Sequence, residues 1–461
     1  MMIARLTSLL TGFGLFVSAV PISETITRDV VILGGGSTGT YAAIRLKDLG
    51  KSFVIVERSN RLGGHGETFY PAENTPINYG VEGLFNTSAT RAYLHRLNVP
   101  YEVRVPASSN DQYLNLRTGS KVQIKSVDEQ QALKPYLDAI AQFSFLTDGP
   151  YNLPDPVPED LLLPFGDFVK KYNLEPTILP NINHGCGDIF NMMTLYHVQY
   201  LGIPHAKALG EGYLRPVNGM ADIYTRAARE LAEDVLFSTT AQSIRRSTDA
   251  VELLAVSRHS NGTTTRTLIH AKQLLVTIPV TLDNLHPIVD LDAHETDLFS
   301  RWRYQTYYAA LVNNTGLTDG VNLLNIDPDN ALSVPREPLI WRIDAQRVPD
   351  YRTIKLVGNQ SFTAQDAQQL MAETFAKLSA RGTYPAARRP HIVAWGDHTP
   401  STMSVSADEI RNGFYRSLYG LQGRHRTFYT GLAWASDYST LLWRYTDTVI
   451  EQMRAGWGKE A

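Results

Sequence analysis

The sequence has little cysteine, little net charge and no long apolar run. A single cysteine, Cys186, excludes an intrachain disulfide, and we interpret it as a buried apolar residue rather than a nucleophile. A net charge of −3 over 461 residues, without a long basic run, argues against nucleic-acid binding. No segment reaches the roughly 20 apolar residues that a membrane-spanning helix needs, so stable membrane insertion is not expected.

Two classes of catalytic motif are also missing. His184, His197 and His205 do not form H-E-x-x-H or another recognised ligand spacing, so no metal site is predicted. No G-x-S-x-G elbow occurs, which argues against a serine hydrolase.

The N-terminus has the pattern of a signal peptide over residues 1–19. A short basic start and an apolar stretch precede the small residues Val17-Ser18-Ala19; a buried N-terminal helix is the alternative. We therefore expect entry into the secretory pathway, and secretion or a lumenal location after cleavage. Four N-x-S/T sequons are then candidate glycosylation sites: Asn86, Asn261, Asn313 and Asn359.

Residues 29–57 form a strand, a glycine turn, a helix and a second strand. The apolar run 30–33 suits a buried strand, and Gly34, Gly36 and Gly39 follow at G-x-G-x-x-G spacing. The first glycine permits a tight turn, the second lets the backbone approach a pyrophosphate, and the third lets helix and strand pack closely. This spacing predicts a dinucleotide site and leaves NAD, NADP and FAD open.

Three further residues complete that prediction. Ser37 and Thr38 open the helix, whose free N–H groups and dipole favour phosphate. Glu57 ends the second strand eighteen residues after Gly39, where a carboxylate can accept both hydroxyls of the adenosine ribose.

The continuation Arg61-Leu62-Gly63-Gly64-His65-Gly66-Glu67-Thr68 resembles the R-x-G-G-x-x-x-[ST] signature of the FAD-dependent amine oxidase and phytoene desaturase superfamily. The resemblance implies that FAD is the cofactor and that this second turn lies along its pyrophosphate. His65 stands where amine oxidases usually have arginine. In this the chain is similar to the fungal beta-cyclopiazonate dehydrogenase-like group, and we favour a non-covalent cofactor contact for His65 over covalent attachment.

The resemblance extends to the C-terminus. Phe428-Tyr429-Thr430-Gly431 resembles the family's last motif, although Leu432 replaces the acidic residue that often follows it, and the helix opening at Ser439 would face flavin N1 and O2. Together, the residues predicted to bind the cofactor are Gly34, Gly36, Ser37, Thr38, Gly39, Glu57, Arg58, Arg61, Gly63, Gly64, His65, Gly80, Val81, Ala241, Thr277, Gly431, Thr440 and Leu441.

At 461 residues the chain is expected to form two closely packed domains. We predict an α/β fold with a three-layer Rossmann-type FAD-binding domain over residues 27–85, 211–280 and 391–461. An inserted α+β substrate domain would take residues 86–210 and 281–390.

The reaction is less determined than the cofactor. We expect an FAD-dependent oxidase or dehydrogenase that transfers hydride to flavin N5 from a small hydrophobic secondary metabolite, which can carry an amine, with oxygen or another acceptor taking the electrons. The alternatives are an FAD-dependent double-bond isomerase without net oxidation and a flavin-binding protein without turnover.

The sequence assigns no catalytic residue. The lysine that amine oxidases place near N5 is absent from the expected strand, residues 302–312. Aromatic walls would suit a flat hydrophobic substrate, and the candidates for its pocket, for which core packing is an equal reading, are Tyr196, Tyr200, Tyr307, Trp395 and Tyr438.

Overall fold

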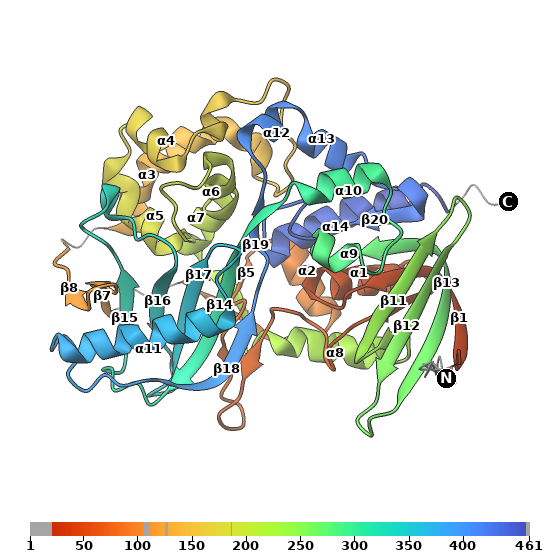
Figure 1. Ribbon diagram of the computed structural model, residues 1–461, viewed down its shortest axis with the longest axis horizontal. Coiled ribbons are helices and arrows are strands. Elements are labelled where there is room, and N and C mark those ends of the chain that lie inside the picture. Colours follow the sequence, from red (N-terminus) through yellow and green to blue (C-terminus); the bar gives the residue numbers. More distant parts are fainter. Residues whose placement is uncertain (1–20, 106–109, 125–127, 186, 458–461) are drawn as a thin grey trace, which may run out of the picture.

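The protein is described by a computed structural model over residues 21–105, 110–124, 128–185 and 187–457. Two large sheets organise these residues, one on each side of the elongated molecule in Figure 1. The predicted signal peptide and Cys186 lie outside the described residues.

The first sheet has the order β10-β2-β1-β13-β12-β11, with β20 paired to β13. Its members from β10 to β13, and β20, run parallel, whereas β13, β12 and β11 are antiparallel. Residues 30–33 of β1 and all of β2 are buried, as expected for parallel strands covered on both faces. The bounds are β1 Glu24–Leu33, β2 Phe53–Val56, β10 Val235–Leu236, β11 Thr239–Arg246, β12 Val251–Arg258, β13 Thr264–Val276 and β20 Thr427–Tyr429.

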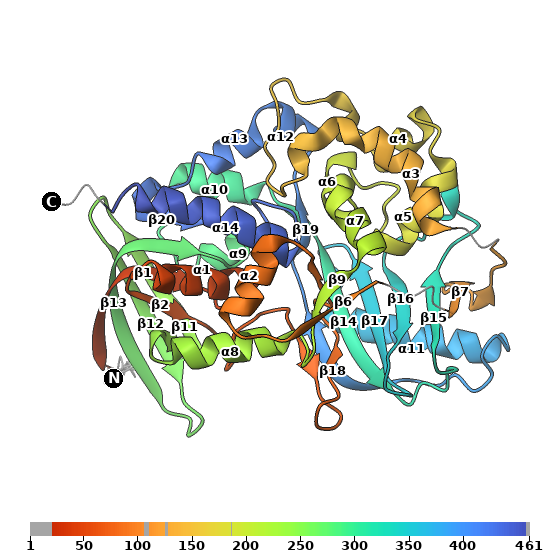
Figure 2. The same cartoon turned by 180° about the vertical axis from the view of Figure 1, so that it is seen from behind.

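Three helices, α1 (Ser37–Asp48), α8 (Ala221–Leu231) and α14 (Ser439–Arg454), lie together beside this sheet (Figures 1 and 2). Tyr41 of α1 stacks on Trp443 of α14 with ring centroids 5.4 Å apart, and its hydroxyl donates to Asp447 at 2.9 Å. The first and last helices of the layer are therefore fixed to each other, although about 400 residues separate them in the chain.

The second sheet has eight strands in the order β18-β14-β17-β16-β15-β7-β8, with β19 paired to β14. Alternate residues point to opposite faces: Ile354 and Leu356 of β17 join a core with Phe375 of α11 (Ala364–Ala380), while Val357 joins Trp341 on the other face. The bounds are β7 Asn110–Asn115, β8 Ser120–Lys121, β14 Arg303–Asn313, β15 Val321–Asn325, β16 Leu339–Ala345, β17 Arg352–Gly358, β18 His391–Asp397 and β19 Ser401–Ser404.

The face of the second sheet opposite α11 is overlaid by helices of the region 129–211, as both views show (Figures 1 and 2). These helices are α3 Glu129–Ile140, α4 Phe165–Lys171, α5 Ile178–His184, α6 Thr194–Tyr200 and α7 Ile203–Glu211. A small sheet of β5 (Leu84–Phe85), β9 (Tyr213–Pro216) and β6 (Tyr101–Arg104), and the pair β3 (Thr68–Phe69) and β4 (Ile77–Asn78), lie outside the two large sheets. The remaining α-helices are α2 Ser88–Arg96, α9 Leu282–Leu285, α10 Ala293–Ser300, α12 Ala407–Arg411 and α13 Phe414–Tyr419.

The mixed α/β fold class is confirmed, but the contacts differ from three of the predicted domain boundaries. Residues 391–404 pair with β14 of the second sheet instead of returning to the first. Helix α2, assigned to the substrate domain, packs its Tyr93 ring on Tyr41 and Trp443. Helix α10 is tied to the first sheet by the ion pair of Glu295 with Arg246. In each case a long-range contact determines the domain to which the segment belongs. The local sequence of these segments does not show which sheet or helix they contact.

Candidate active site

The first glycine turn is closely packed on two sides and open on the third. A Cβ at Gly39 would stand 2.1 Å from the carbonyl oxygen of Gly34, and a Cβ at Gly34, whose φ is +102°, would stand 2.7 Å from Ile278. A Cβ at Gly36 would meet nothing within 4 Å. The turn therefore leaves free space beside its second glycine, where the spacing predicts a pyrophosphate.

Two helix N-termini meet at this space. The Ser37 and Ser439 hydroxyls, in the first residues of α1 and α14, lie 3.2 Å apart, and the Trp443 indole N–H donates to the Ser37 hydroxyl at 3.0 Å. Neither helix has a side-chain N-cap. Free N–H groups and two positive dipole ends thus converge on one spot, which suits an anion.

Glu57 is held at the adjacent strand end. Its Oε2 accepts from the Gly35 N–H and its Oε1 from the Ser59 N–H, both at 2.7 Å, and the residue is buried. These bonds fix the carboxylate and leave lone pairs on both oxygens, so the geometry is compatible with the predicted ribose contact.

The second glycine turn lies against the first. Gly63 forms an isolated bridge with Gly36, and a Cβ on Gly64 would stand 3.2 Å from the Gly36 Cα. Both glycines have positive φ, +105° and +50°. A Cβ at Gly63 would also overlap Tyr224 of α8 at 2.4 Å, so close packing as well as backbone conformation requires glycine here.

His65 stacks on His398, with ring centroids 4.1 Å apart and an interplanar angle of 20°. Glu67 holds this pair, because its Oε2 lies 3.0 Å from His398 Nε2 and its Oε1 3.0 Å from Arg61. Desolvation, and then the positive charges of His398, Arg58 and Arg61, lower the pKa of His65 to about 3. His65 is therefore neutral at physiological pH. Packing through His398 was not foreseeable from residues 61–68, since His398 comes over 300 residues later.

The remaining predicted cofactor residues lie around these turns with different roles. The Thr277 hydroxyl donates to the carbonyls of Leu33 and Gly34, so it supports the turn, and the Thr440 hydroxyl accepts from the Phe85 N–H. Val81 N–H donates to the His65 carbonyl. For the others the positions are as follows: Gly80 packs on His65, Ala241 stands at a bulge of β11, Gly431 follows β20 with φ +121°, Leu441 opens α14, Thr38 is buried in α1, and Arg58 is exposed.

A cavity of about 1750 Å³ extends from the start of α14 to the second sheet. Three of the five predicted pocket residues line it: Tyr200, Tyr307 and Tyr438. Trp341 lines it as well and was missed by the sequence argument, because its strand alternates like any half-buried one.

The other two predicted pocket residues, Tyr196 and Trp395, do not line this cavity. Tyr196 is buried, and its hydroxyl accepts from the Val405 N–H and the Tyr415 hydroxyl, so it belongs to the core. Trp395 packs on Tyr308 at 5.3 Å, on the face of the second sheet that α11 covers. The sequence pattern could not choose between these faces, because strand periodicity marks two sides without naming which one is covered.

Four charged side chains line one part of the cavity, which we call its floor: Glu82, Arg342, Asp344 and Lys355. Lys355 of β17 lies 3.1 Å from Glu82 and 3.5 Å from Asp344, which in turn pairs with Arg342 at 2.7 Å. Burial opposes the charged form of Lys355, but the two carboxylates outweigh it and raise its pKa, so Lys355 is a cation at neutral pH. Lys355 lies on the strand that neighbours β14, where it pairs with Ala309.

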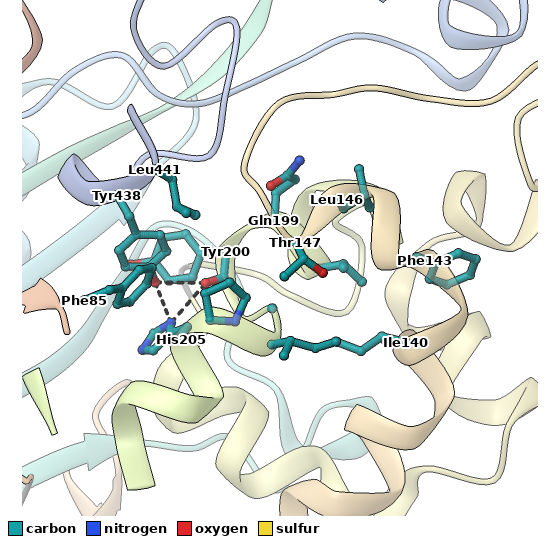
Figure 3. Close-up of a pocket in the computed structure, with 14 residues that line it drawn as sticks. Phe85, Ile140, Phe143, Leu146, Thr147, Gln199, Tyr200, His205, Tyr438 and Leu441 are labelled. Atoms are coloured by element: carbon teal, nitrogen blue, oxygen red, sulfur yellow. Dashed lines mark hydrogen bonds between the residues drawn. The ribbon is translucent and has the colours of Figure 1, made fainter. Parts of the chain in front are cut away.

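A second, small cavity of about 20 Å³ adjoins the start of α14 (Figure 3). Phe85, Tyr438 and Leu441 lie on one side of it, and helical residues such as Ile140 on the other. The Tyr438 hydroxyl lies 2.5 Å from His205 Nδ1 and 2.8 Å from the Tyr200 carbonyl oxygen, so its hydrogen-bonding capacity is used within the protein.

The comparisons with known proteins agree with this geometry. Residues 38–322 match the family model described as flavin containing amine oxidoreductase. The chain belongs to this family. Beta-cyclopiazonate dehydrogenase of Aspergillus oryzae is 54% identical over 432 residues, covering 93% of this chain and 94% of that protein. An FAD-dependent oxidoreductase of Cochliobolus heterostrophus, oblC, is 34% identical over 94% of this chain and 92% of its own length.

Solved structures share the fold. A CLA-producing fatty acid isomerase from P. acnes has a TM-score of 0.73 at 19% identity, covering 92% of this chain and 98% of that one. Putrescine oxidase bound to putrescine has a TM-score of 0.65 at 14% identity, covering 93% and 100%. With the family shown, the protein is an FAD-dependent oxidoreductase. The open Gly36 cradle and the converging helix N-termini are the features that fit FAD.

Two further features concern metal binding and membrane insertion. Within the described residues no group of three metal-ligating side chains occurs, and no helix there has the length and apolarity to cross a membrane. Of the sequon residues, Asn261 and Asn359 are exposed, whereas Asn86 and Asn313 are half-buried.

Proposed function

We propose that this oxidoreductase dehydrogenates a small, largely hydrophobic secondary metabolite bound in the 1750 Å³ cavity, by hydride transfer to flavin N5. The observation that carries the proposal is the cavity itself, which joins the α14 N-terminus to aromatic walls and a charge-balanced floor. The relative's name makes beta-cyclopiazonate the first compound to test, with analogues of similar size after it.

Aromatic rings give the cavity flat apolar surfaces. Tyr200, Tyr307 and Trp341 lie on one core cluster, so their positions are fixed by packing. The Trp341 indole N–H donates to the Ile182 carbonyl at 2.9 Å, which leaves its ring face for contacts with a ligand. Such walls favour a flat substrate with few charges.

The floor supplies polarity without a net field. Two cations, Arg342 and Lys355, face two anions, Asp344 and Glu82. Because the four charges cancel, this floor can orient a polar or amine group of the substrate without demanding one sign of charge.

The cofactor supplies the redox chemistry: when bound, FAD accepts a hydride equivalent from a substrate C–H bond. The chain's own residues bind the cofactor and the substrate and stabilise the cofactor's negative charges. The first turns of α1 and α14 bind anionic groups, Glu57 binds the ribose, and His65, neutral and stacked on His398, gives an uncharged surface beside the second turn.

The test is anaerobic mixing of the purified holoprotein with beta-cyclopiazonate and analogues. Dehydrogenation predicts bleaching of the flavin's visible absorption and a product two hydrogens lighter than the substrate. Reoxidation by oxygen, compared with artificial acceptors, then identifies the electron acceptor. A flavin that stays oxidised while this class of substrate is bound would contradict the proposal.

Double-bond isomerisation is the alternative, in which hydride is taken and returned. The likeness to the fatty acid isomerase concerns the fold alone and does not choose between the reactions. Isomerisation predicts a product of unchanged mass and no need for oxygen. A flavin-binding protein without turnover predicts no change in either flavin or ligand.

The secretory location is also a proposal. The leader pattern of residues 1–19 and the exposed sequons at Asn261 and Asn359 support it. Expression in a fungal host should give a glycosidase-sensitive protein in the medium or in the lumen of the secretory pathway. An unprocessed, unglycosylated protein in the cytosol would contradict it.

A further inference from the structure

Asp437 lies where the chain enters α14, at the edge of the 1750 Å³ cavity. It lies in the loop between β20 and α14, two residues before the first residue of that helix, and it lines the cavity together with its neighbours Tyr438, Ser439 and Thr440. The side chain is exposed to the cavity. A carboxylate is thus presented to a bound ligand from the α14 side.

Within the described part of the chain, Asp437 differs from the other acidic side chains of this cavity because it makes no hydrogen bond and no ion pair. Each of the others is matched by a cation or a donor: Glu82 by Lys355, Glu102 by Arg347, Asp111 by Asn322, Asp128 by the first N–H groups of α3, Glu129 by His184, Glu211 by Lys207 and Asp344 by Arg342.

The titratable groups whose charges reach Asp437 are His398, after β18, and Tyr151, in the loop after α3. His398 is already bonded to Glu67. Enclosure by protein raises the pKa of Asp437 to about 6, and His398 opposes this rise only in part. Asp437 is therefore largely ionised at pH 7 and able to take up a proton near neutrality.

The alternative proton acceptors in the cavity are engaged. Tyr438 and His205 bond to each other, and His184 bonds to Glu129. Lys355 is held as a cation by two carboxylates. A proton acceptor for a ligand must be unprotonated and not already hydrogen-bonded within the protein. Among the described cavity residues, Asp437 meets both conditions.

We propose that Asp437 accepts the proton lost from an N–H or O–H group of the substrate when the adjacent C–H bond is oxidised. The inference rests on the proposed dehydrogenation. It also names the substrate class: a hydrophobic compound with an amine, indole, phenol or enol hydrogen next to the oxidised carbon or conjugated with it.

The step balances in atoms and electrons. The substrate's C–H bond breaks and its electron pair leaves with the hydrogen as hydride, which the family's cofactor accepts. The N–H or O–H bond breaks, its electron pair forms the new bond to the oxidised carbon or extends conjugation to it, and its proton adds to a carboxylate oxygen of Asp437. The substrate loses two hydrogens and two electrons.

The test compares the wild-type holoprotein with Asp437→Asn, Asp437→Glu and the control Asp167→Asn. Asp167 of α4 is exposed, paired with Lys170 at 3.3 Å and not among the residues that line the cavity, so its loss should change little. With beta-cyclopiazonate, the wild-type rate of anaerobic flavin reduction should rise with pH to a plateau, with its midpoint near 6. Asp437→Asn should lower the plateau about 10²–10⁴-fold and remove the midpoint, and Asp437→Glu should restore both in part.

A second measurement does not depend on turnover. A fluorinated phenol bound to the holoprotein reports its own protonation through its ¹⁹F chemical shift. Loss of the neighbouring negative charge in Asp437→Asn should raise the bound phenolate-to-phenol ratio about tenfold, because a nearby anion disfavours the phenolate. Asp167→Asn should leave the ratio unchanged.

The outcomes separate the two proposals. If beta-cyclopiazonate and its analogues never reduce the wild-type flavin, the proposed function fails, while the phenol ratio still decides whether Asp437 faces a bound proton donor. An unchanged ratio, a reduction rate in Asp437→Asn close to that of wild type, or loss of FAD from that variant would each overturn the proton-acceptor role.

Discussion

At the scale of single residues, the glycines of the first turn have separable duties. Gly36 borders open space, whereas Gly39 is pressed against the Gly34 carbonyl. A side chain at Gly36 would compete with the cofactor, and one at Gly39 would compete with the protein's own backbone. Cofactor binding and folding can therefore be perturbed one at a time within four residues.

We predict that Gly36→Val lowers FAD affinity at least about tenfold, equal to about 1.4 kcal/mol, because its methyl groups fill the cradle. The free energy of unfolding of this apoprotein should lie within about 0.5 kcal/mol of the wild-type value, because the site has room for a side chain and Gly36 has an ordinary φ of −64°. Gly39→Ala should instead destabilise the fold by about 1–3 kcal/mol. Flavin fluorescence titration and thermal melts of the apoproteins check both expectations.

Glu57 gives a second prediction at this scale. Glu57→Ala should weaken FAD retention, because the ribose loses its acceptor and the Gly35 and Ser59 N–H groups lose theirs. The flavin-to-protein absorbance ratio after gel filtration measures this retention. Full occupancy of the variant would contradict the ribose role.

At the scale of elements, buried polar contacts connect β11, α10 and β20. Arg246 of β11 bonds Glu295 of α10 through two nitrogens, both at 2.7 Å, and the Tyr429 hydroxyl of β20 donates to the same carboxylate. Three segments distant in sequence meet at one fully buried carboxylate. Helix α10 is therefore joined to the first sheet, contrary to the predicted domain boundary.

Removing one partner of this buried pair should leave an uncompensated charge. We predict that Glu295→Gln destabilises the protein by about 3–5 kcal/mol. Asp290→Asn, at the more exposed side of the same arginine, should have a much smaller effect. Urea unfolding at pH 7 measures both variants, and equal losses would contradict the buried-charge explanation.

The same carboxylate gives a pH dependence. Burial alone would raise the pKa of Glu295, but the hydrogen bonds from Arg246 and Tyr429 outweigh it and lower the pKa. Stability from a lowered carboxylate pKa is present above the unfolded value of about 4.3 and is lost as the pH falls through the folded value. Wild-type stability should therefore decline more steeply than that of Glu295→Gln below about pH 4.3.

At the scale of the whole molecule, the cofactor cradle draws on both ends of the chain. Residues 34–39 and 439–443 form it together, and α1 stacks on α14 through Tyr41 and Trp443. A ligand that bridges these segments stabilises the folded state by mass action. FAD binding and global stability should therefore be coupled.

We predict that removing FAD lowers the melting temperature, and that adding it back at about 100 times its dissociation constant restores about 2.7 kcal/mol. FMN and NAD should restore much less, because neither offers both the adenosine ribose for Glu57 and a flavin for the α14 end. Differential scanning calorimetry of the apoprotein with each compound measures the effect. Equal rescue by NAD would contradict the assignment of the site.

Local sequence was sufficient for the parts of the site whose chemistry is local. The glycine spacing, the buried strands 30–33 and 53–56, and Glu57 each depend on a few neighbouring residues, because a tight turn and a close helix–strand contact constrain those positions directly. The cofactor followed from these residues and from the resemblance of residues 61–68, and membership of the family supports it.

Only the tertiary structure decided where the cavity lies and which residues face it. Trp395 and Tyr307 are both aromatic residues on neighbouring strands, yet one packs under α11 and the other faces the cavity. Lys355 and Asp437 carry no motif. Lys355 pairs with two carboxylates, whereas Asp437 has no hydrogen-bond or ion-pair partner among the residues that the structure describes. The sequence shows neither fact, because side-chain direction and long-range pairing are set by packing.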